Sequence, residues 1–271
     1  MTTTRLVSPL SLAKGALKDY RQGWKRLIWI VAIVAVPVQL IIASYTSAGT
    51  ADFDSNAYRY AAILAMNVAL LWAIVLFNRD GQVPKAADAY YGGSALLIRF
   101  FIIIMLLSLM LIPLFIGLAL YSAGASALNT PGTTPEVLII VFVSLLIALP
   151  SLYMLIRYAL AFVVSADADL YPVAALRAAR SLTIGRFWRV TARYVALIGF
   201  MILIAIPAAL VDFLLVRAGQ PVLGQFIFGL FTTLISLPLF NLYLLRLYRD
   251  LQIVKAPFKP KKSETSESDV I

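Results

Sequence analysis

The chain alternates between long apolar runs and short segments that hold most of its charged residues. A transmembrane helix needs roughly 20 apolar residues, because it rises about 1.5 Å per residue through a hydrocarbon layer about 30 Å thick. Six runs satisfy this requirement: residues 27–45, 60–77, 96–120, 137–164, 194–216 and 222–245. The pattern therefore predicts an all-α, polytopic integral membrane protein whose six transmembrane helices form three hairpins, with interfacial amphipathic helices on the cytoplasmic side.

The segments between the runs are too short to fold as separate domains, since they stay below the roughly 40 residues that a chain usually needs to fold alone. We predict a cytoplasmic amphipathic segment over residues 1–26, a six-helix membrane domain over 27–252 and a cytoplasmic tail over 253–271. The tail changes from basic to acidic and has little apolar content, which predicts disorder. Residues 121–136, rich in small residues, predict a flexible outer connection.

Basic residues fall almost entirely in alternate connecting segments. Of the 23 lysines and arginines, 20 lie before the first run, between the second run and the start of the third, between the fourth and fifth, or from the end of the sixth run onward. Because positively charged segments stay in the cytoplasm, we predict that both termini are cytoplasmic. Alternatively, the first run is a cleaved signal peptide; that would leave five runs, whereas the alternation of charge fits six.

A similar unit precedes the first, third and fifth runs. Each copy begins near a proline (Pro9, Pro84 and Pro172), continues through an alanine-rich stretch and meets a glycine before its run. Proline is tolerated in the first turn of a helix, where its missing N–H would be unpaired in any case. Two interpretations stay open: a true repeat of one surface helix and one membrane hairpin, or simply the basic interfacial ends of transmembrane helices.

The third copy predicts a short amphipathic helix in the headgroup zone. Its apolar positions recur every three residues: Val173, Leu176, Ala179 and Leu182. Arg177 and Arg180 fall between these positions, on another face of the helix. Asp167 and Asp169 precede the helix, and we expect them to favour its positive N-terminal end.

Two motifs lie at the end of the fourth run and at the end of the sixth. Residues 157–189 read RYALAFVVSADADLYPVAALRAARSLTIGRFWR, and residues 241–250 read NLYLLRLYRD. With these motifs the chain resembles the glycerophosphoryl diester phosphodiesterase membrane-domain-like family, which includes small six-span bacterial membrane proteins of unknown function. The resemblance implies the six-helix fold, and we predict that the protein lies in a bacterial cytoplasmic (inner) membrane. Hydrolysis in the enzymes that name the family belongs to a separate soluble barrel, so no catalytic residue is carried over.

The composition narrows the possible chemistry. The chain has no cysteine and no histidine, which removes disulfides, thiolate or imidazole metal sites, and Ser-His or Cys-His triads. Only carboxylate or lysine chemistry is left, so we predict no enzyme activity, no metal and no cofactor. The net charge is +10 in a chain that is 62% hydrophobic and 13% charged. In a membrane protein this charge favours contact with anionic lipid over binding of nucleic acid.

Two charged residues inside predicted spans are candidate functional residues. Arg157 lies about seven residues from the cytoplasmic end of its run, roughly 10 Å deep at about 1.5 Å per residue. It either snorkels to the headgroups, binds a phosphate or stabilises the bundle. Asp212 lies near the outer end of its run, where we expect it to meet water, Arg59 or Arg217 rather than Arg157.

Aromatic and basic side chains on the cytoplasmic flanks are the candidate headgroup contacts. They are Trp24, Lys25, Arg26, Arg177, Arg180, Arg186, Trp188, Arg189 and Arg193. They favour a non-enzymatic structural or lipid-interacting membrane module, with anionic lipids as partners and an unidentified membrane protein that it assists. The alternative is a small transporter or permease subunit, because five of the six runs contain a proline that could break a helix beside a transport site. Proline is also common in membrane helices that transport nothing.

Overall fold

The computed structural model describes residues 6–48, 55–128 and 135–255, and these residues form helices and no strand. The elements are α1 Pro9–Ala48, α2 Ser55–Asp80, α3 Ala86–Met110, α4 Ile112–Leu128, α5 Pro135–Tyr158, α6 Ala161–Asp167, α7 Pro172–Thr183, α8 Phe187–Arg217, α9 Pro221–Phe231, the π-helix η1 Thr232–Ser236 and α10 Leu237–Lys255. Six helical stretches are long and apolar enough to cross a membrane. The predicted all-α polytopic membrane fold is confirmed. Most of the predicted disordered tail, and the middle of the predicted outer connection, fall outside the described residues.

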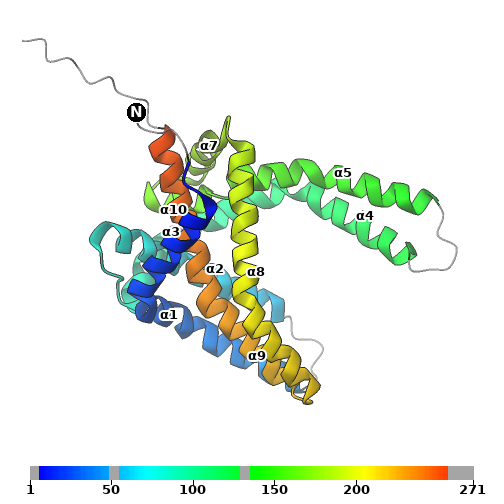
Figure 1. Ribbon diagram of the computed structural model, residues 1–271, viewed down its shortest axis with the longest axis horizontal. Helices are drawn as coiled ribbons and strands as arrows, with labels where there is room; N and C mark the ends of the chain where they lie inside the picture. Colours follow the sequence, from blue (N-terminus) through cyan, green and yellow to red (C-terminus); the bar gives the residue numbers. More distant parts are fainter. Residues whose placement is uncertain (1–5, 49–54, 129–134, 256–271) are drawn as a thin grey trace, which may run out of the picture.

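Neighbouring helices form the three predicted hairpins. α1 packs against α2, α4 against α5, and α8 against α9. The far end of α1 and the α8–α9 turn lie together at the bottom of Figure 1. The α4–α5 hairpin, which we call the arm, extends instead to the right, away from the other two hairpins (Figure 1).

α10 is the central helix of the bundle. It packs against α1, α2, α6, α7 and α8. Its buried side chains include Leu239, Leu242, Tyr243, Leu247 and Leu251. A helix that buries most of its circumference organises the helices around it, and the polar residues of α10 are therefore well placed to join distant segments.

Two of the predicted spans are interrupted. The run 96–120 is divided at Leu111, between α3 and α4, and the run 137–164 is divided between α5 and α6. Pro113 accounts for the first interruption, because it lacks an N–H and its ring crowds the preceding turn. In the last span the π-helix η1 directly precedes α10, which contains Pro238; a π-turn is a common way to absorb such a disturbance.

The three copies of the predicted unit fold differently. Only the third copy forms a separate short helix, α7, because Gly185 takes a positive φ of 72° and turns the chain before α8. In the first copy α1 continues through Gly23, whose Cα packs so closely on Val83 that an added Cβ would lie 2.7 Å from a Val83 methyl group. The repeated glycines thus serve a turn in one copy and close packing in another.

Segments that are distant in the sequence meet at one end of the molecule, which we call the basic end. It comprises the start of α1, the α2–α3 connection, the α6–α7 connection, the start of α8 and the end of α10. Arg26 of α1 donates a hydrogen bond to the Val83 carbonyl, and the N–H of Val7 donates to the Asp250 carboxylate at 3.1 Å. These are the segments in which the basic residues of the chain are concentrated.

Candidate functional site

An ion pair with two hydrogen bonds joins α10 to α1 at the basic end. Arg246 donates from Nε and Nη2 to the two carboxylate oxygens of Asp19, both at 2.6 Å. Gly15 makes room for the guanidinium, because a Cβ at this position would lie 2.3 Å from Arg246 Nη1. A planar guanidinium facing a carboxylate in this way is the strongest common form of ion pair. It holds the first and last described helices together.

Two further polar contacts link α10 to its neighbours deeper in the bundle. Asn241 Nδ2 donates to Asn67 Oδ1 of α2 at 3.0 Å, and Tyr243 donates its hydroxyl hydrogen to the Arg193 carbonyl of α8 at 3.1 Å. Both Asn241 and Tyr243 are buried. Polar groups in an apolar interior need partners, so these bonds favour one arrangement of α2, α8 and α10.

Arg193 is buried, with only 6% of the residue exposed. Its guanidinium donates to the Arg189 carbonyl at 2.8 Å and to the Val7 carbonyl at 2.5 Å. Val7 in turn donates its N–H to Asp250, which is 8% exposed. A single residue of the N-terminal segment therefore bridges a buried cation and a buried anion.

The prediction that Arg193 contacts lipid headgroups is therefore wrong. The inward face of α8 carries Arg193 together with Val190 and Leu197, all of which are buried. This spacing of three and four residues places the three side chains on one side of a helix. The sequence alone could not show which face of α8 meets the bundle.

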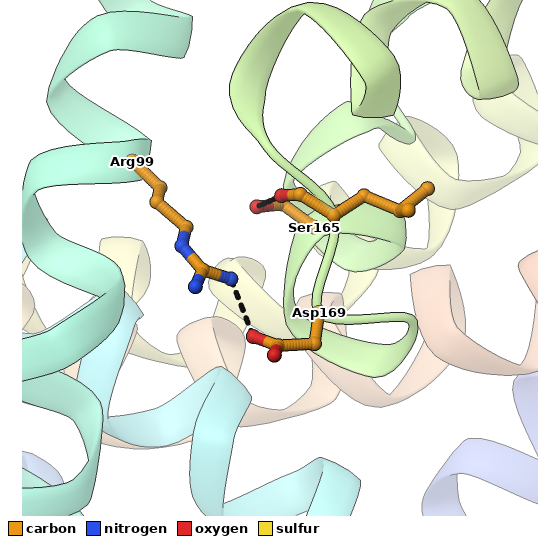
Figure 2. A network of polar contacts seen from close by, with 4 residues as sticks. Arg99, Ser165 and Asp169 are labelled. Carbon is orange, nitrogen blue, oxygen red and sulfur yellow. Dashed lines mark hydrogen bonds and ion pairs between the residues drawn. The ribbon is translucent and has the colours of Figure 1, made fainter.

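The α6–α7 connection is held by a polar contact from α3 and by a polar contact between its own residues, as Figure 2 shows. Arg99 of α3 forms an ion pair with Asp169, and Ser165 donates its hydroxyl hydrogen to the Leu170 carbonyl at 3.1 Å. Asp169 has a positive φ of 51°, a conformation that aspartate tolerates better than most residues. These contacts set the direction in which the chain enters α7.

Asp167, at the end of α6, pairs with Arg249 of α10 at 3.6 Å. We expected Asp167 and Asp169 to favour the N-terminus of α7. The N-cap position of α7 belongs to Tyr171, without a side-chain capping bond. Both aspartates instead bind arginines of other helices, so their main role in this structure is to tie the connection to α3 and α10.

α7 buries one face and exposes the opposite face. The buried residues are Pro172, Ala175, Leu176, Ala179, Leu182 and Thr183. Val173 is 58% exposed, so the predicted three-residue period was wrong at this position; the true spacing follows the 3.6-residue turn. Val173, Arg177, Arg180 and Ile184 are all exposed. Val173, Arg177 and Arg180 are spaced four and three residues apart, so they lie along one side of α7. Ile184 directly follows the end of the helix, and we call these four residues the α7 stripe.

The other predicted headgroup contacts occupy different environments. Trp188 is 80% exposed at the start of α8, and Arg189 beside it is also exposed. Trp24 and Lys25 are exposed on α1, with Lys25 Nζ 5.8 Å from the centroid of the Trp24 ring. The guanidinium of Arg26 is engaged by the Val83 carbonyl. Arg186 is half-buried at the turn before α8.

Arg157 and Asp212 lie on different helices and form no ion pair with each other within the described part of the chain. Arg157 lies just before the end of α5, and its guanidinium carbon is 5.1 Å from the centroid of the Tyr153 ring. Asp212 faces α9 so closely that a Cβ on Gly224 would lie 2.5 Å from its Oδ1. This oxygen is buried and has no hydrogen-bond partner among the described residues.

The expected partner of Asp212, Arg217, lies over the ring of Phe213, with its guanidinium carbon 4.9 Å from the ring centroid. The other expected partner, Arg59, has a side chain outside the described part of the structure. Asp212 is thus half-buried, with Oδ1 turned toward α9, and is not paired with Arg217 at the rim. Sequence position alone suggested the rim because Asp212 is close to the end of α8.

The fold and these contacts define the class of the protein: an all-α polytopic membrane protein with six candidate spans and a basic end tied together by buried polar contacts. Within residues 6–48, 55–128 and 135–255 no cluster of three or more acidic side chains is placed to hold a metal ion. Comparisons of the chain with models of protein families, with curated proteins and with solved structures found no match.

Sequence reasoning named Asp167 and Asp169 but did not identify the contacts that tie the basic end together. Asp19, Asp167, Asp169 and Asp250 all lie in segments that are otherwise basic, and the chain has only 13 acidic residues. Each of the four accepts a hydrogen bond or an ion pair from another helix or from the N-terminal segment. An acidic residue within a flank that is otherwise basic was therefore the signal that could have marked them.

Proposed function

We propose that the protein is a non-enzymatic structural module of a bacterial cytoplasmic membrane and that its basic end binds anionic lipid headgroups on the cytoplasmic side. The positive-inside rule supports this orientation, because 20 of the 23 basic residues belong to segments on one side of the predicted spans. Membership of the glycerophosphoryl diester phosphodiesterase membrane-domain-like family is part of the proposal, and the two motifs of residues 157–189 and 241–250 support it.

The observation that carries the proposal is the α7 stripe. Its two exposed guanidiniums, of Arg177 and Arg180, lie between two exposed apolar side chains, of Val173 and Ile184. An interfacial helix needs this combination, because apolar groups enter the acyl boundary while guanidiniums bind phosphate oxygens. The opposite face of α7 is buried, so the stripe is held in place before any lipid binds.

The test uses the full chain reconstituted in phosphatidylcholine vesicles with increasing phosphatidylglycerol. A basic residue near an anionic surface contributes about 1 kcal/mol, so the double variant Arg177→Gln/Arg180→Gln should lose about 2 kcal/mol of the stabilisation that phosphatidylglycerol gives. Arg217→Gln, at the other end of α8, is the matched control and should keep it. Thermal unfolding followed by circular dichroism measures the difference. Equal stabilisation of the double variant and the control by phosphatidylglycerol would contradict the proposal.

A second candidate function, a small transporter or permease subunit, is favoured by the environment of Asp212. Its Oδ1 is buried without a hydrogen-bond partner among the described residues, and unpaired ionisable groups in spans often mark ion pathways. The π-helix η1 in the neighbouring span is a further feature found at functional sites. Ion or phosphate flux into vesicles that is lost in Asp212→Asn and kept in the exposed control Asp80→Asn would support transport. Absence of flux over a panel of ions would exclude it.

A further inference from the structure

We infer that Arg157 binds the phosphate group of one anionic phospholipid, whose acyl chains lie along an exposed apolar face of α5. The inference rests on the proposed function only in taking the basic end to face anionic lipid. It uses no residue of the α7 stripe, so the stripe and this site can fail separately. Its evidence is the lack of a protein partner for the Arg157 guanidinium, the aromatic cluster that holds this group, and the apolar face that leads to it.

Arg157 has no anionic partner in the part of the chain that the structure describes. It takes part in none of the three ion pairs found there and donates no hydrogen bond there. The four aspartates that tie the basic end together are bound to other groups. A guanidinium carries five N–H donors, and a charged group within a span is costly unless it is paired. At the edge of a bilayer, a lipid phosphate is the anion that supplies such a partner.

An aromatic cluster of three rings joins α5 to α8 and holds Arg157. The guanidinium carbon lies 5.1 Å from the centroid of the Tyr153 ring, and this ring lies 4.8 Å from that of Phe187. Phe187 in turn lies 5.4 Å from Trp188. The base of the arm is beside the start of α8 (Figure 1), and α5 also packs against α3 and α7. A guanidinium over a ring still presents N–H groups at its edge, so the cluster orients Arg157 before any lipid binds.

The same cluster places Arg157 at the level of the headgroups. Trp188 is exposed in the first turn of α8, which belongs to the basic end. Tryptophan is enriched at membrane surfaces, where its ring is in an apolar layer and its N–H meets water. Because Tyr153 contacts both Arg157 and Phe187, the guanidinium is one ring away from the start of α8. Arg157 is half-buried, and an anion therefore reaches it from the membrane surface.

An exposed apolar face of α5 leads to Arg157. Phe142, Leu146, Leu149 and Tyr153 precede it at intervals of four, three, four and four residues, which places all five residues on one side of a helix. The four apolar and aromatic side chains belong to residues that are at least 40% exposed. The face is about 22 Å long at about 1.5 Å per residue, more than half of a hydrocarbon layer about 30 Å thick. A cation at one end of such a face is complementary to a phosphate that carries acyl chains.

The chemistry of the guanidinium selects among lipids. It binds two phosphate oxygens through two parallel hydrogen bonds, whereas an ammonium group acts as a point charge. In phosphatidylcholine the choline cation neutralises the phosphate, and in phosphatidylglycerol no cation does so. The site should therefore prefer phosphatidylglycerol. Arg157→Lys keeps the positive charge and still reaches the headgroups, but it should lose most of the affinity because the pair of hydrogen bonds is lost.

Native mass spectrometry of the full chain in non-ionic detergent tests the inference, with phosphatidylglycerol as the probe. The first phosphatidylglycerol should bind at least about tenfold more weakly to Arg157→Lys than to the unmodified protein, the effect of losing one hydrogen bond to a charged group. Arg217→Lys is the matched control, because Arg217 also lies over a ring, that of Phe213, and is in none of the ion pairs of the described residues. This control should keep the affinity. Circular dichroism verifies the fold of each variant.

Equal affinities of Arg157→Lys and the unmodified protein would overturn the inference, because charge alone would then suffice. A measurement without any variant gives a second test: the unmodified protein should bind phosphatidylglycerol several-fold more tightly than phosphatidylcholine, and equal binding of the two lipids would also overturn the site.

The α7 stripe and inorganic phosphate provide the remaining comparisons. Loss of the first lipid in Arg177→Gln/Arg180→Gln, without a loss in Arg157→Lys, would support the proposed function and overturn this site. The reverse result would support this site and count against the stripe. Inorganic phosphate in excess should not displace the lipid. Displacement would overturn the assignment to a lipid, because free phosphate has no acyl chain to contact α5.

Discussion

The close approach of α4 and α5 at Gly117 gives a quantitative prediction. In Gly117→Ala the new Cβ would lie 2.6 Å from the Ser144 carbonyl oxygen, whereas real Cβ atoms essentially never come within 3.0 Å of another atom. The helices must therefore separate by at least 0.4 Å, the difference of these two distances. The obstacle is backbone, so it cannot rotate away. Overpacking of this kind costs about 1–3 kcal/mol.

Alanine also gains up to about 1 kcal/mol of helix propensity over glycine, which offsets part of the clash. Gly199→Ala in α8 is the matched control, because its Cβ would meet no atom within 4 Å. The propensity gain is common to both variants, so the difference in their free energies of unfolding isolates the clash, about 1–3 kcal/mol. Unfolding by sodium dodecyl sulfate in mixed micelles, followed by circular dichroism, measures this difference. If Gly117→Ala is as stable as Gly199→Ala, the close packing of the arm is refuted.

Two further predictions concern α10. Asp19→Asn should lower the free energy of unfolding by about 2 kcal/mol, a value between those of exposed and buried ion pairs, because Arg246 and Asp19 are both partly buried. The control Asp80→Asn should change the free energy of unfolding by less than about 0.5 kcal/mol. Equal effects of the two variants in the detergent titration would contradict the role of the ion pair. Asn241→Leu should cost about 0.6 kcal/mol, the average for a hydrogen bond between membrane helices. Adding Asn67→Leu should cost little more, because the bond is already lost; additive losses would show that the two amides act independently.

The sequence predicted the helical membrane fold because each membrane-spanning helix is indicated by a local run of apolar residues. A run of apolar residues is long enough to cross a bilayer whatever its neighbours are, and the six predicted runs coincide with described helices, two of them with a short interruption. The separate helix α7 was also predicted from Pro172 and its amphipathic pattern. The interruption at Leu111 could have been inferred from Pro113, whereas the break between α5 and α6 has no comparable signal in the chain.

The candidate site could be predicted only in part. Arg177, Arg180, Trp188 and Arg189 are exposed as a headgroup contact requires, although contact with lipid itself stays a prediction. Arg193 was misassigned, since an arginine in a basic flank has the same local sequence whether its helix face points inward or outward. Pairs such as Arg246 with Asp19 are separated by 227 residues, and no local pattern indicates which acidic residue a given arginine will meet.

By itself, the sequence determined the helical class, the six apolar runs and the concentration of basic residues in alternate connections. These properties follow from the free energy of transfer of each side chain between water and hydrocarbon, which does not depend on the other side chains. The tertiary structure alone decided that α10 is central, that Val7 bridges Arg193 and Asp250, and that the arm diverges from the other hairpins. These properties depend on which helix faces meet, and close packing and paired polar groups select among faces that hydrophobicity leaves nearly equal.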